Sequence, residues 1–246
     1  MGKNKAVVLH DAAKESLELL RKAGFPIDVD IEFKVDNALP YMGHTMRKGS
    51  GHAVVVSGNA LKSPMLYGLL LHELSHVRRN IEKHPSHDNA LLDSLFAHIL
   101  LARSENTGIV QALHTAVNHI QDLYADDIVF RVIRRNPIIT LGVLESFFTE
   151  WAIDAPSESR GRKKARENGA MLLRNSFAVS NMERHGLNAS EALVKAGRFL
   201  QRSGLSDDDF AYFRRYMTNM AENPTAKRFE KDMIAYLERF LHTIGE

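Results

Sequence analysis

The fold is predicted from residues 64–81, which read PMLYGLLLHELSHVRRNI. Its apolar positions recur every three or four residues, at Leu70, Leu74, Val77 and Ile81. This spacing is typical of a helix that buries one face. Ser63 and Pro64 precede it as an N-cap and a proline at the first helical position, so the sequence predicts a strongly apolar helix from Pro64 to Ile81.

A small sheet is predicted before this helix. Residues 27–36 alternate strictly between apolar and charged side chains, which is the period of a half-buried strand. Residues 41–48 and 52–57 flank the turn Gly49-Ser50-Gly51 and predict a hairpin. With a first helix over residues 11–23, we expect a helix followed by a three-stranded antiparallel meander.

The rest of the chain is helical by its periodicity. The predicted helices cover residues 88–103, 107–135, 138–151, 161–184, 189–202, 207–221 and 224–242. The fold class is therefore α+β and mostly α. We expect a core over residues 1–136 and an all-helical C-terminal region over residues 137–246, which could pack onto the core as one unit.

Composition limits the chemistry. The chain has 246 residues and no cysteine, so thiolate zinc sites, disulfides and cysteine nucleophiles are excluded, and a metal would be held by His, Asp or Glu. The 32 Lys and Arg against 30 Asp and Glu give a formal charge of +2, too balanced to indicate nucleic acid as a partner.

Apolar stretches also limit the location. The longest, residues 65–71, is far shorter than the roughly 20 residues that cross a bilayer, and the first residues lack the apolar segment of a secretory signal. We therefore expect a cytoplasmic protein without a membrane partner. The sequence does not indicate an oligomeric state.

His72, Glu73 and His76 form the pattern His-Glu-x-x-His inside the apolar helix. Four residues are slightly more than one turn, so both imidazoles project from one face and can meet a single ion. Glu73 is rotated from His72 by about 100°, which lets it reach a water molecule without binding the metal. The pattern can arise by accident among 12 histidines, but burying these groups on an apolar helix without a ligand is costly. We expect a Zn²⁺ site.

A third ligand is expected from the helix over residues 107–135, because catalytic zinc usually takes three side chains. Asp122 and Asp126 lie four residues apart on one stripe of this helix, which also carries His119. One carboxylate could bind the metal while the other accepts the Nδ1 proton of a ligand histidine. His119 is an equally competent ligand, and a solvated acidic face is the structural alternative.

His72-Glu73-x-x-His76, followed on a later helix by Asp122-Leu-Tyr-Ala-Asp126, resembles the gluzincin clan of zinc metallopeptidases. In that clan the His-Glu-x-x-His helix is followed by a helix with Glu-x-x-x-Asp. The resemblance covers residues 11–135 and implies a zincin-like core. It implies that His72, His76 and Asp122 bind zinc, that Glu73 is the general base, and that Asp126 supports a ligand from behind. The chain departs from the clan in one respect, because Asp122 stands where the clan has Glu.

The implied function is zinc-dependent hydrolysis of peptide bonds in peptides or unfolded proteins, through a metal-activated water with Glu73 as general base. The resemblance also implies that the strand over residues 53–57 pairs with an extended substrate. The alternative is a non-catalytic zincin-like domain that binds metal or another protein.

Other residues have expected roles of lesser weight. An oxyanion donor is expected from His119, His114 or His185. His84 and His87, which flank Pro85, are expected to be exposed in a loop. The basic run over residues 160–166 is expected to be solvated; phosphate or nucleic-acid binding by a helical interaction protein is a third, weaker interpretation.

Overall fold

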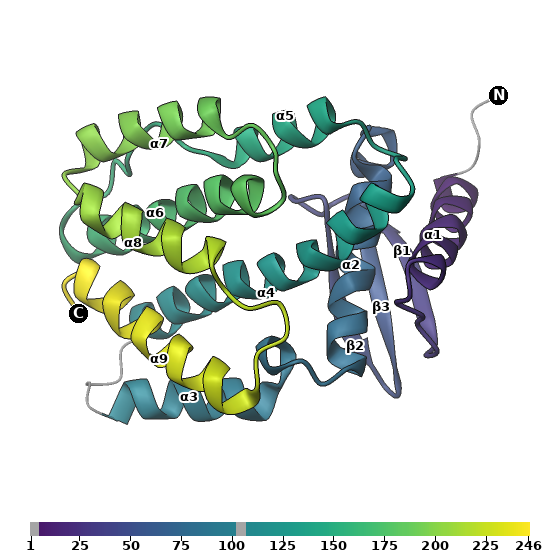
Figure 1. Cartoon of the computed structure of the whole chain (residues 1–246), viewed down its shortest axis with the longest axis horizontal. Helices are drawn as coiled ribbons and strands as arrows, with labels where there is room; N and C mark the ends of the chain where they lie inside the picture. The colour runs from purple at the N-terminus through teal and green to yellow at the C-terminus, as the bar shows by residue number, and fades with distance from the viewer. Residues whose placement is uncertain (1–4, 102–106) are drawn as a thin grey trace. The chain divides into compact units, whose positions relative to one another are not determined.

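The computed structural model describes residues 5–101 and 107–246 (Figure 1). The elements follow in the order α1 (Lys5–Lys22), β1 (Ile31–Asp36), β2 (Gly43–Lys48), β3 (Gly51–Ser57), η1 (Ala60–Lys62), α2 (Leu66–Ile81), η2 (Pro85–His87), α3 (Asn89–Leu101), α4 (Thr107–Arg135), α5 (Leu141–Trp151), α6 (Gly161–Arg184), α7 (Ser190–Ser203), α8 (Asp207–Thr218) and α9 (Ala226–Thr243). The end predicted at Arg103 for the helix starting at residue 88 lies outside the described residues.

The chain forms two compact units, each made of two segments. The first unit comprises residues 1–84 and 124–144, and the second comprises residues 85–123 and 145–246. The expected segments 1–136 and 137–246 are consecutive, whereas these units interleave along the chain. They do so because α3 packs on α9 within the second unit and because the continuous helix α4 contributes residues to both units.

The sheet of the first unit is mixed, with the strand order β1-β3-β2. β2 and β3 form the predicted antiparallel hairpin, but β1 pairs parallel with β3. The expected antiparallel meander is therefore wrong at β1. β3 takes the centre because it is apolar on both faces, with Ala53, Val54 and Val56 buried, whereas the alternating burial of β1 suits an edge strand. As the central strand, β3 has both edges paired, so the expectation that residues 53–57 add a substrate strand is wrong too.

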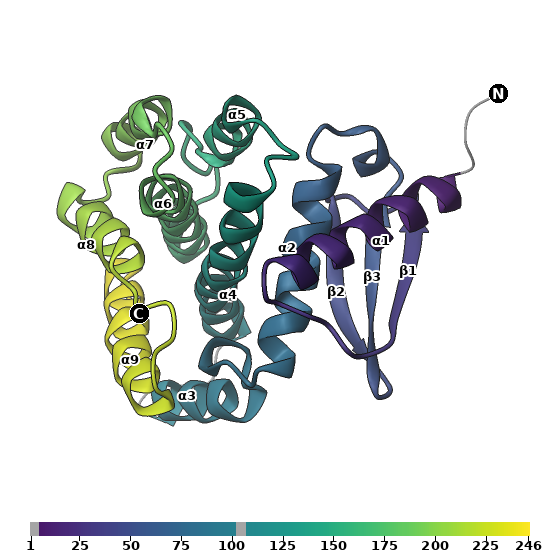
Figure 2. The ribbon, with the colours of Figure 1, turned by 45° about the vertical axis from the view of Figure 1, so that its right-hand side comes forward.

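Helices α1 and α2 cover the same face of this sheet (Figure 2). The register places Phe33 and Thr45 on either side of Val54, so these three side chains share one face. α2 buries Leu70, Leu74 and other apolar side chains completely. This burial is the physical reason that the apolar periodicity predicted the helix correctly; its first residue is Leu66, two residues after Pro64.

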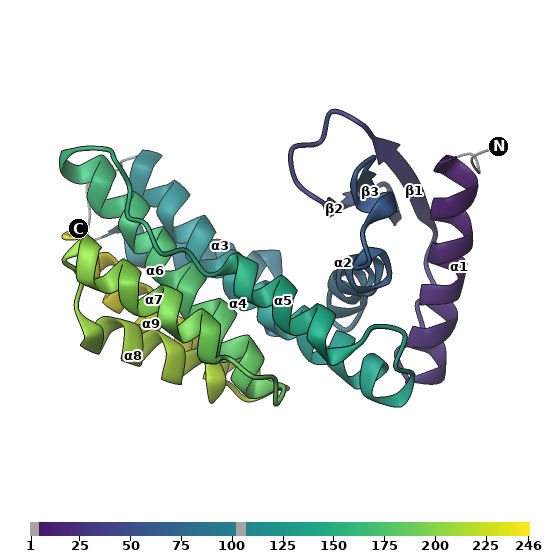
Figure 3. The same cartoon turned by 90° about the horizontal axis from the view of Figure 1, so that it is seen from above.

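The second unit is entirely helical in its described part. α6 packs against both α7 and α8, and Figure 3 shows the three helices running side by side. Large aromatic side chains, among them Phe177, Phe213 and Phe240, are buried in the unit. Gly169 lies so close to α9 that a Cβ atom there would meet Ile244 Cγ2 at 2.2 Å, so a residue without a side chain is required at this contact.

The fold class is confirmed in its coarse form, since the described chain is mostly helical with one small sheet near the N-terminus. Among the described residues, none of the helices combines the length and the apolar character needed to pass through a bilayer.

Candidate metal centre

Helix α2 brings the two histidines of the His-Glu-x-x-His pattern together. Nε2 of His76 lies 3.0 Å from Nε2 of His72, and the two rings meet edge to face with centroids 4.7 Å apart. Two nitrogens that bind one tetrahedral zinc at 2.0–2.1 Å are separated by about 3.3 Å. The two nitrogens therefore converge at nearly the separation that one ion requires.

Asp126 of α4 supports His72 from behind. Its Oδ1 lies 2.7 Å from Nδ1 of His72, and the Asp126 side chain is only 7% exposed. A carboxylate accepts, so Nδ1 of His72 carries the proton and Nε2 offers its lone pair toward His76. This arrangement fixes both the tautomer and the orientation of a histidine that could bind metal.

Asp122 completes a group of three donors. One ligand atom from each of His72, His76 and Asp122 lies within 4.8 Å of the other two, and all three residues are half-buried. Asp122 precedes Asp126 by about one turn of the continuous helix α4, so the helix that supports His72 also carries the third donor. Two imidazole nitrogens and one carboxylate oxygen form a donor set that suits zinc.

Glu73 is held by a residue that the sequence did not indicate. Thr45 of β2 donates its hydroxyl to Glu73 Oε2 at 2.8 Å and lies 3.1 Å from the Glu73 carbonyl oxygen. Glu73 is 6% exposed, so this hydrogen bond is shielded from water. The hairpin pattern could have placed Thr45 on the inner face of the sheet, but not opposite a particular residue of α2.

A second contact fixes α2 against α4 within the first unit. The buried guanidinium of Arg79 donates from Nε to the carbonyl oxygen of Tyr124 at 3.0 Å. Burial lowers the pKa of Arg79, and the charges of Glu82 and Asp127 oppose that shift. Together with the His72–Asp126 hydrogen bond, this contact sets which residues of the two helices face each other.

His84 and His87 are both buried, so the expectation of exposed loop residues is wrong. The ring of His84 packs on Tyr124, with centroids 4.4 Å apart, and burial lowers the pKa of His84 to about 4, with a smaller contribution from the charge of Arg79. His87 ends a 3₁₀ turn in which its Nδ1 lies 2.7 Å from Ser86 Oγ. The turn after Pro85 thus folds inward.

The other histidines considered as ligands or oxyanion donors lie in the second unit. His119 stacks on Phe177 at 5.3 Å, and burial lowers its pKa, opposed by the charge of Asp122. His119 is not part of the group formed by His72, His76 and Asp122 among the described residues. His114 packs edge-on against Phe96, and His185 follows α6 as its C-cap.

The basic run begins at Arg160, immediately before α6. Arg166 forms an ion pair with Glu246 at 2.6 Å, and Lys163 lies 3.8 Å from Glu167. Part of the positive charge of the run is therefore balanced within the protein.

Comparisons with known proteins place the chain in a family. No curated protein and no solved structure matches the chain. Residues 10–242 match DUF5781, a family of unknown function, over nearly the whole length of the chain. The chain therefore belongs to the family DUF5781.

Proposed function

We propose that this protein is a zinc-dependent peptidase that hydrolyses peptides or unfolded protein segments. The proposal rests on the convergence of the Nε2 atoms of His72 and His76, which lie 3.0 Å apart, and on the hydrogen bond between Asp126 and Nδ1 of His72. A histidine pair that is only structural has no need for a carboxylate that turns its lone pair toward the second ring.

His72, His76 and Asp122 would hold the zinc, and their donor set fits it. Bound zinc supplies a Lewis acid that polarises a carbonyl group and acidifies a water molecule. Asp122 has one methylene less than the Glu of the gluzincin clan, so α4 must approach α2 more closely. The 2.7 Å contact between Asp126 and His72, one turn further along α4, supports such an approach.

Glu73 would be the general base. Thr45 holds Oε2 at 2.8 Å, which leaves Oε1 as the oxygen that can accept a proton from water and later deliver it to the leaving amine. Because the hydrogen bond comes from a strand and not from a flexible loop, the carboxylate keeps one orientation during the proton transfers.

The substrate would extend along β2. In the first unit β2 is an edge strand. Met42, just before β2, accepts from the N–H of Ser57, so its main-chain groups face β3. Because this orientation alternates along the strand, the main-chain groups of Gly43, Thr45 and Arg47 face outward. A peptide that pairs with the main chain of Thr45 would run beside Glu73, because the Thr45 side chain donates to the Glu73 carboxylate.

The experiment replaces Glu73 by Gln. We expect Glu73→Gln to keep one zinc per chain and to reduce cleavage of a fluorescence-quenched peptide library by about 10²–10⁴-fold, because only the proton acceptor is lost. Glu150→Gln, the same change at an exposed position of α5, is the control and should leave cleavage within about twofold of the parent.

Three outcomes contradict the proposal. If Glu73→Gln cleaves as fast as the parent protein, Glu73 is not the base. If the zinc-loaded parent cleaves no peptide of the library, the chain is the non-catalytic metal-binding domain instead. A parent protein that retains no stoichiometric zinc would mean that the histidine pair is accidental.

A further inference from the structure

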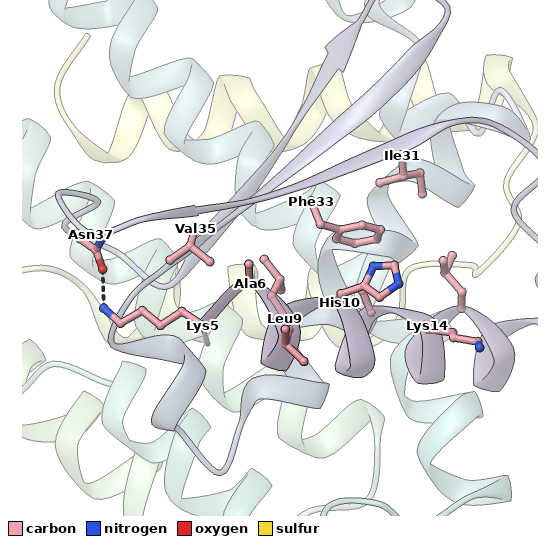
Figure 4. Close-up of a pocket in the computed structure, with 12 residues that line it drawn as sticks. Lys5, Ala6, Leu9, His10, Lys14, Ile31, Phe33, Val35 and Asn37 are labelled. Atoms are coloured by element: carbon pink, nitrogen blue, oxygen red, sulfur yellow. Dashed lines mark hydrogen bonds between the residues drawn. The ribbon is translucent and has the colours of Figure 1, made fainter. Parts of the chain in front are cut away.

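A groove runs between α1 and β1, at the sheet edge opposite to β2 (Figure 4). It has a volume of about 950 Å³ and is lined mainly by apolar side chains. β1 contributes Ile31, Phe33 and Val35 to its floor, and α1 contributes residues along one stripe, including Leu9 and Ala13. A groove of this size can accept several side chains of a bound molecule.

The free edge of β1 borders this groove. The carbonyl oxygen of Asp30 accepts from His52 of β3 and that of Asp36 accepts from Gly58, just after β3, so the main-chain groups of the even-numbered residues of β1 face the sheet. The N–H and C=O groups of Ile31, Phe33 and Val35 therefore face outward. Among residues 5–101 and 107–246, no further strand pairs with them. Unpaired main-chain groups beside apolar pockets are what an added strand requires.

Two lysines lie at opposite ends of the groove. Lys5 donates to the neutral side chain of Asn37 at 2.7 Å at one end, and Lys14 lies toward Ile31 at the other, with His10 between them (Figure 4). Within the described chain neither lysine forms an ion pair. A ligand that carries negative charge at both ends would therefore be complementary to the groove.

The spacing of the lysines specifies the ligand further. Lys5 and Lys14 are nine helical residues apart, which corresponds to about 13.5 Å along α1 and to two and a half turns, so their side chains leave the helix on opposite flanks of the groove. Four residues of an extended chain cover about 13 Å, and residues i, i+2 and i+4 point to the same face. Two acidic side chains at i and i+4 would thus match the axial separation of the two lysines, whose long flexible stems bend toward the groove from its two flanks, while the side chain at i+2 enters the apolar centre near Phe33.

We propose that this groove binds an extended segment of another protein, which adds to β1 as a fourth strand and carries acidic side chains at i and i+4 around an apolar side chain at i+2. The site is independent of the candidate zinc centre, since it uses the other edge of the sheet. A fatty acid would match the apolar floor, but it has one anionic group and cannot pair with the outward N–H and C=O groups of β1.

The test uses the end-blocked, fluorescein-labelled peptide Thr-Glu-Thr-Val-Thr-Glu-Thr and fluorescence anisotropy with the full chain. We expect saturable binding, and binding weaker by about tenfold when both Glu are replaced by Lys. Lys14→Glu should also weaken binding by about tenfold. Lys22→Glu, the same change on α1 outside the groove, should leave the dissociation constant within about twofold.

Strand addition is tested by the main chain of the peptide. Methylating the amide nitrogens of the second, fourth and sixth residues, or those of the third and fifth, removes donors on one edge at a time. We expect only one of the two methylated peptides to lose binding, by at least about tenfold. In the complex, the amide protons of Phe33 and Val35 should exchange more slowly with solvent.

Several results would overturn the proposal. They are the absence of binding, equal binding by both methylated peptides, and an unchanged affinity in Lys14→Glu when its thermal unfolding matches that of the parent. Binding of dodecanoate without binding of the peptide would assign the groove to an apolar carboxylate instead. Glu73 lies on α2 and does not line the groove, so Glu73→Gln should bind the peptide with the same affinity as the parent. The peptidase proposal and the groove proposal can therefore fail independently.

Discussion

The carboxylate of Asp126 should contribute strongly to zinc affinity, and Asp126→Asn isolates that contribution. The substitution keeps the size of the side chain and removes its charge. The Asp126 oxygen lies 2.7 Å from Nδ1 of His72 in a site where Asp126 is 7% exposed, so water does not replace the lost charge. Carboxylates behind ligand histidines contribute about 10–100-fold in metal affinity, which corresponds to about 1.4–2.7 kcal/mol.

The assay is a competition titration of zinc between the protein and a chromophoric chelator. Asp126→Asn should raise the zinc dissociation constant about 10–100-fold while the protein remains folded, as judged by its thermal unfolding. Asp127→Asn is the matched control, because Asp127 is the next residue of α4, is also buried, and acts on Arg79. It should change the constant less than about threefold. Equal zinc affinity in Asp126→Asn and the parent, or equal weakening by both substitutions, would refute this role of Asp126.

Three further predictions concern catalysis and stability. Thr45→Val removes the donor to Glu73, so kcat on the quenched peptides should fall about tenfold while zinc affinity is unchanged; an unaltered kcat would contradict the role of Thr45. Burial lowers the pKa of His84 from 6.5 to about 4, so as the pH falls His84 is protonated in the unfolded chain before it is protonated in the folded chain. The free energy of unfolding should therefore drop by up to about 3 kcal/mol between pH 6.5 and pH 4. Urea titrations of the parent and His84→Gln should show this drop only in the parent. Gly169→Ala should lower the free energy of unfolding by about 1–3 kcal/mol through collision with Ile244, whereas Gly142→Ala, where a Cβ meets open space, should not lower it.

The helices and the ligand faces could be predicted because they depend on local periodicity. The spacing of His72 and His76 places both rings on one side of any helix, and the i, i+4 spacing of Asp122 and Asp126 does the same on α4. Which carboxylate would face His72 depends on how α2 crosses α4. That crossing is fixed by packing and by the Arg79–Tyr124 hydrogen bond, and the periodicity of the sequence predicts neither of these long-range contacts.

The sheet order could not be predicted from strand periodicity. Alternation in residues 27–36 identifies a strand with one buried face, but not the strand with which it pairs. The chain passes from β1 to the far edge at β2 and returns to the centre with β3, so neighbours in sequence are not neighbours in the sheet. Because strand order could not be predicted, the contact of Thr45 with Glu73 was not expected, and β3 was expected to pair with the substrate although it is the central strand.

The burial of His84 illustrates a different limitation. A histidine beside a proline after a helix is usually exposed, and its sequence neighbours gave no apolar signal. It is buried because Tyr124, forty residues further along the chain, supplies a ring for it to pack on. Such a long-range partner is visible only in the folded chain.

Binding of one zinc ion by His72 and His76 can be tested by a crystal structure of the zinc-loaded protein, with anomalous diffraction data collected on both sides of the zinc absorption edge. We expect one anomalous peak per chain, about 2.0–2.1 Å from Nε2 of His72 and of His76, with an oxygen of Asp122 as the next protein ligand. A peak elsewhere, or no peak between these two imidazoles at stoichiometric zinc, would contradict it.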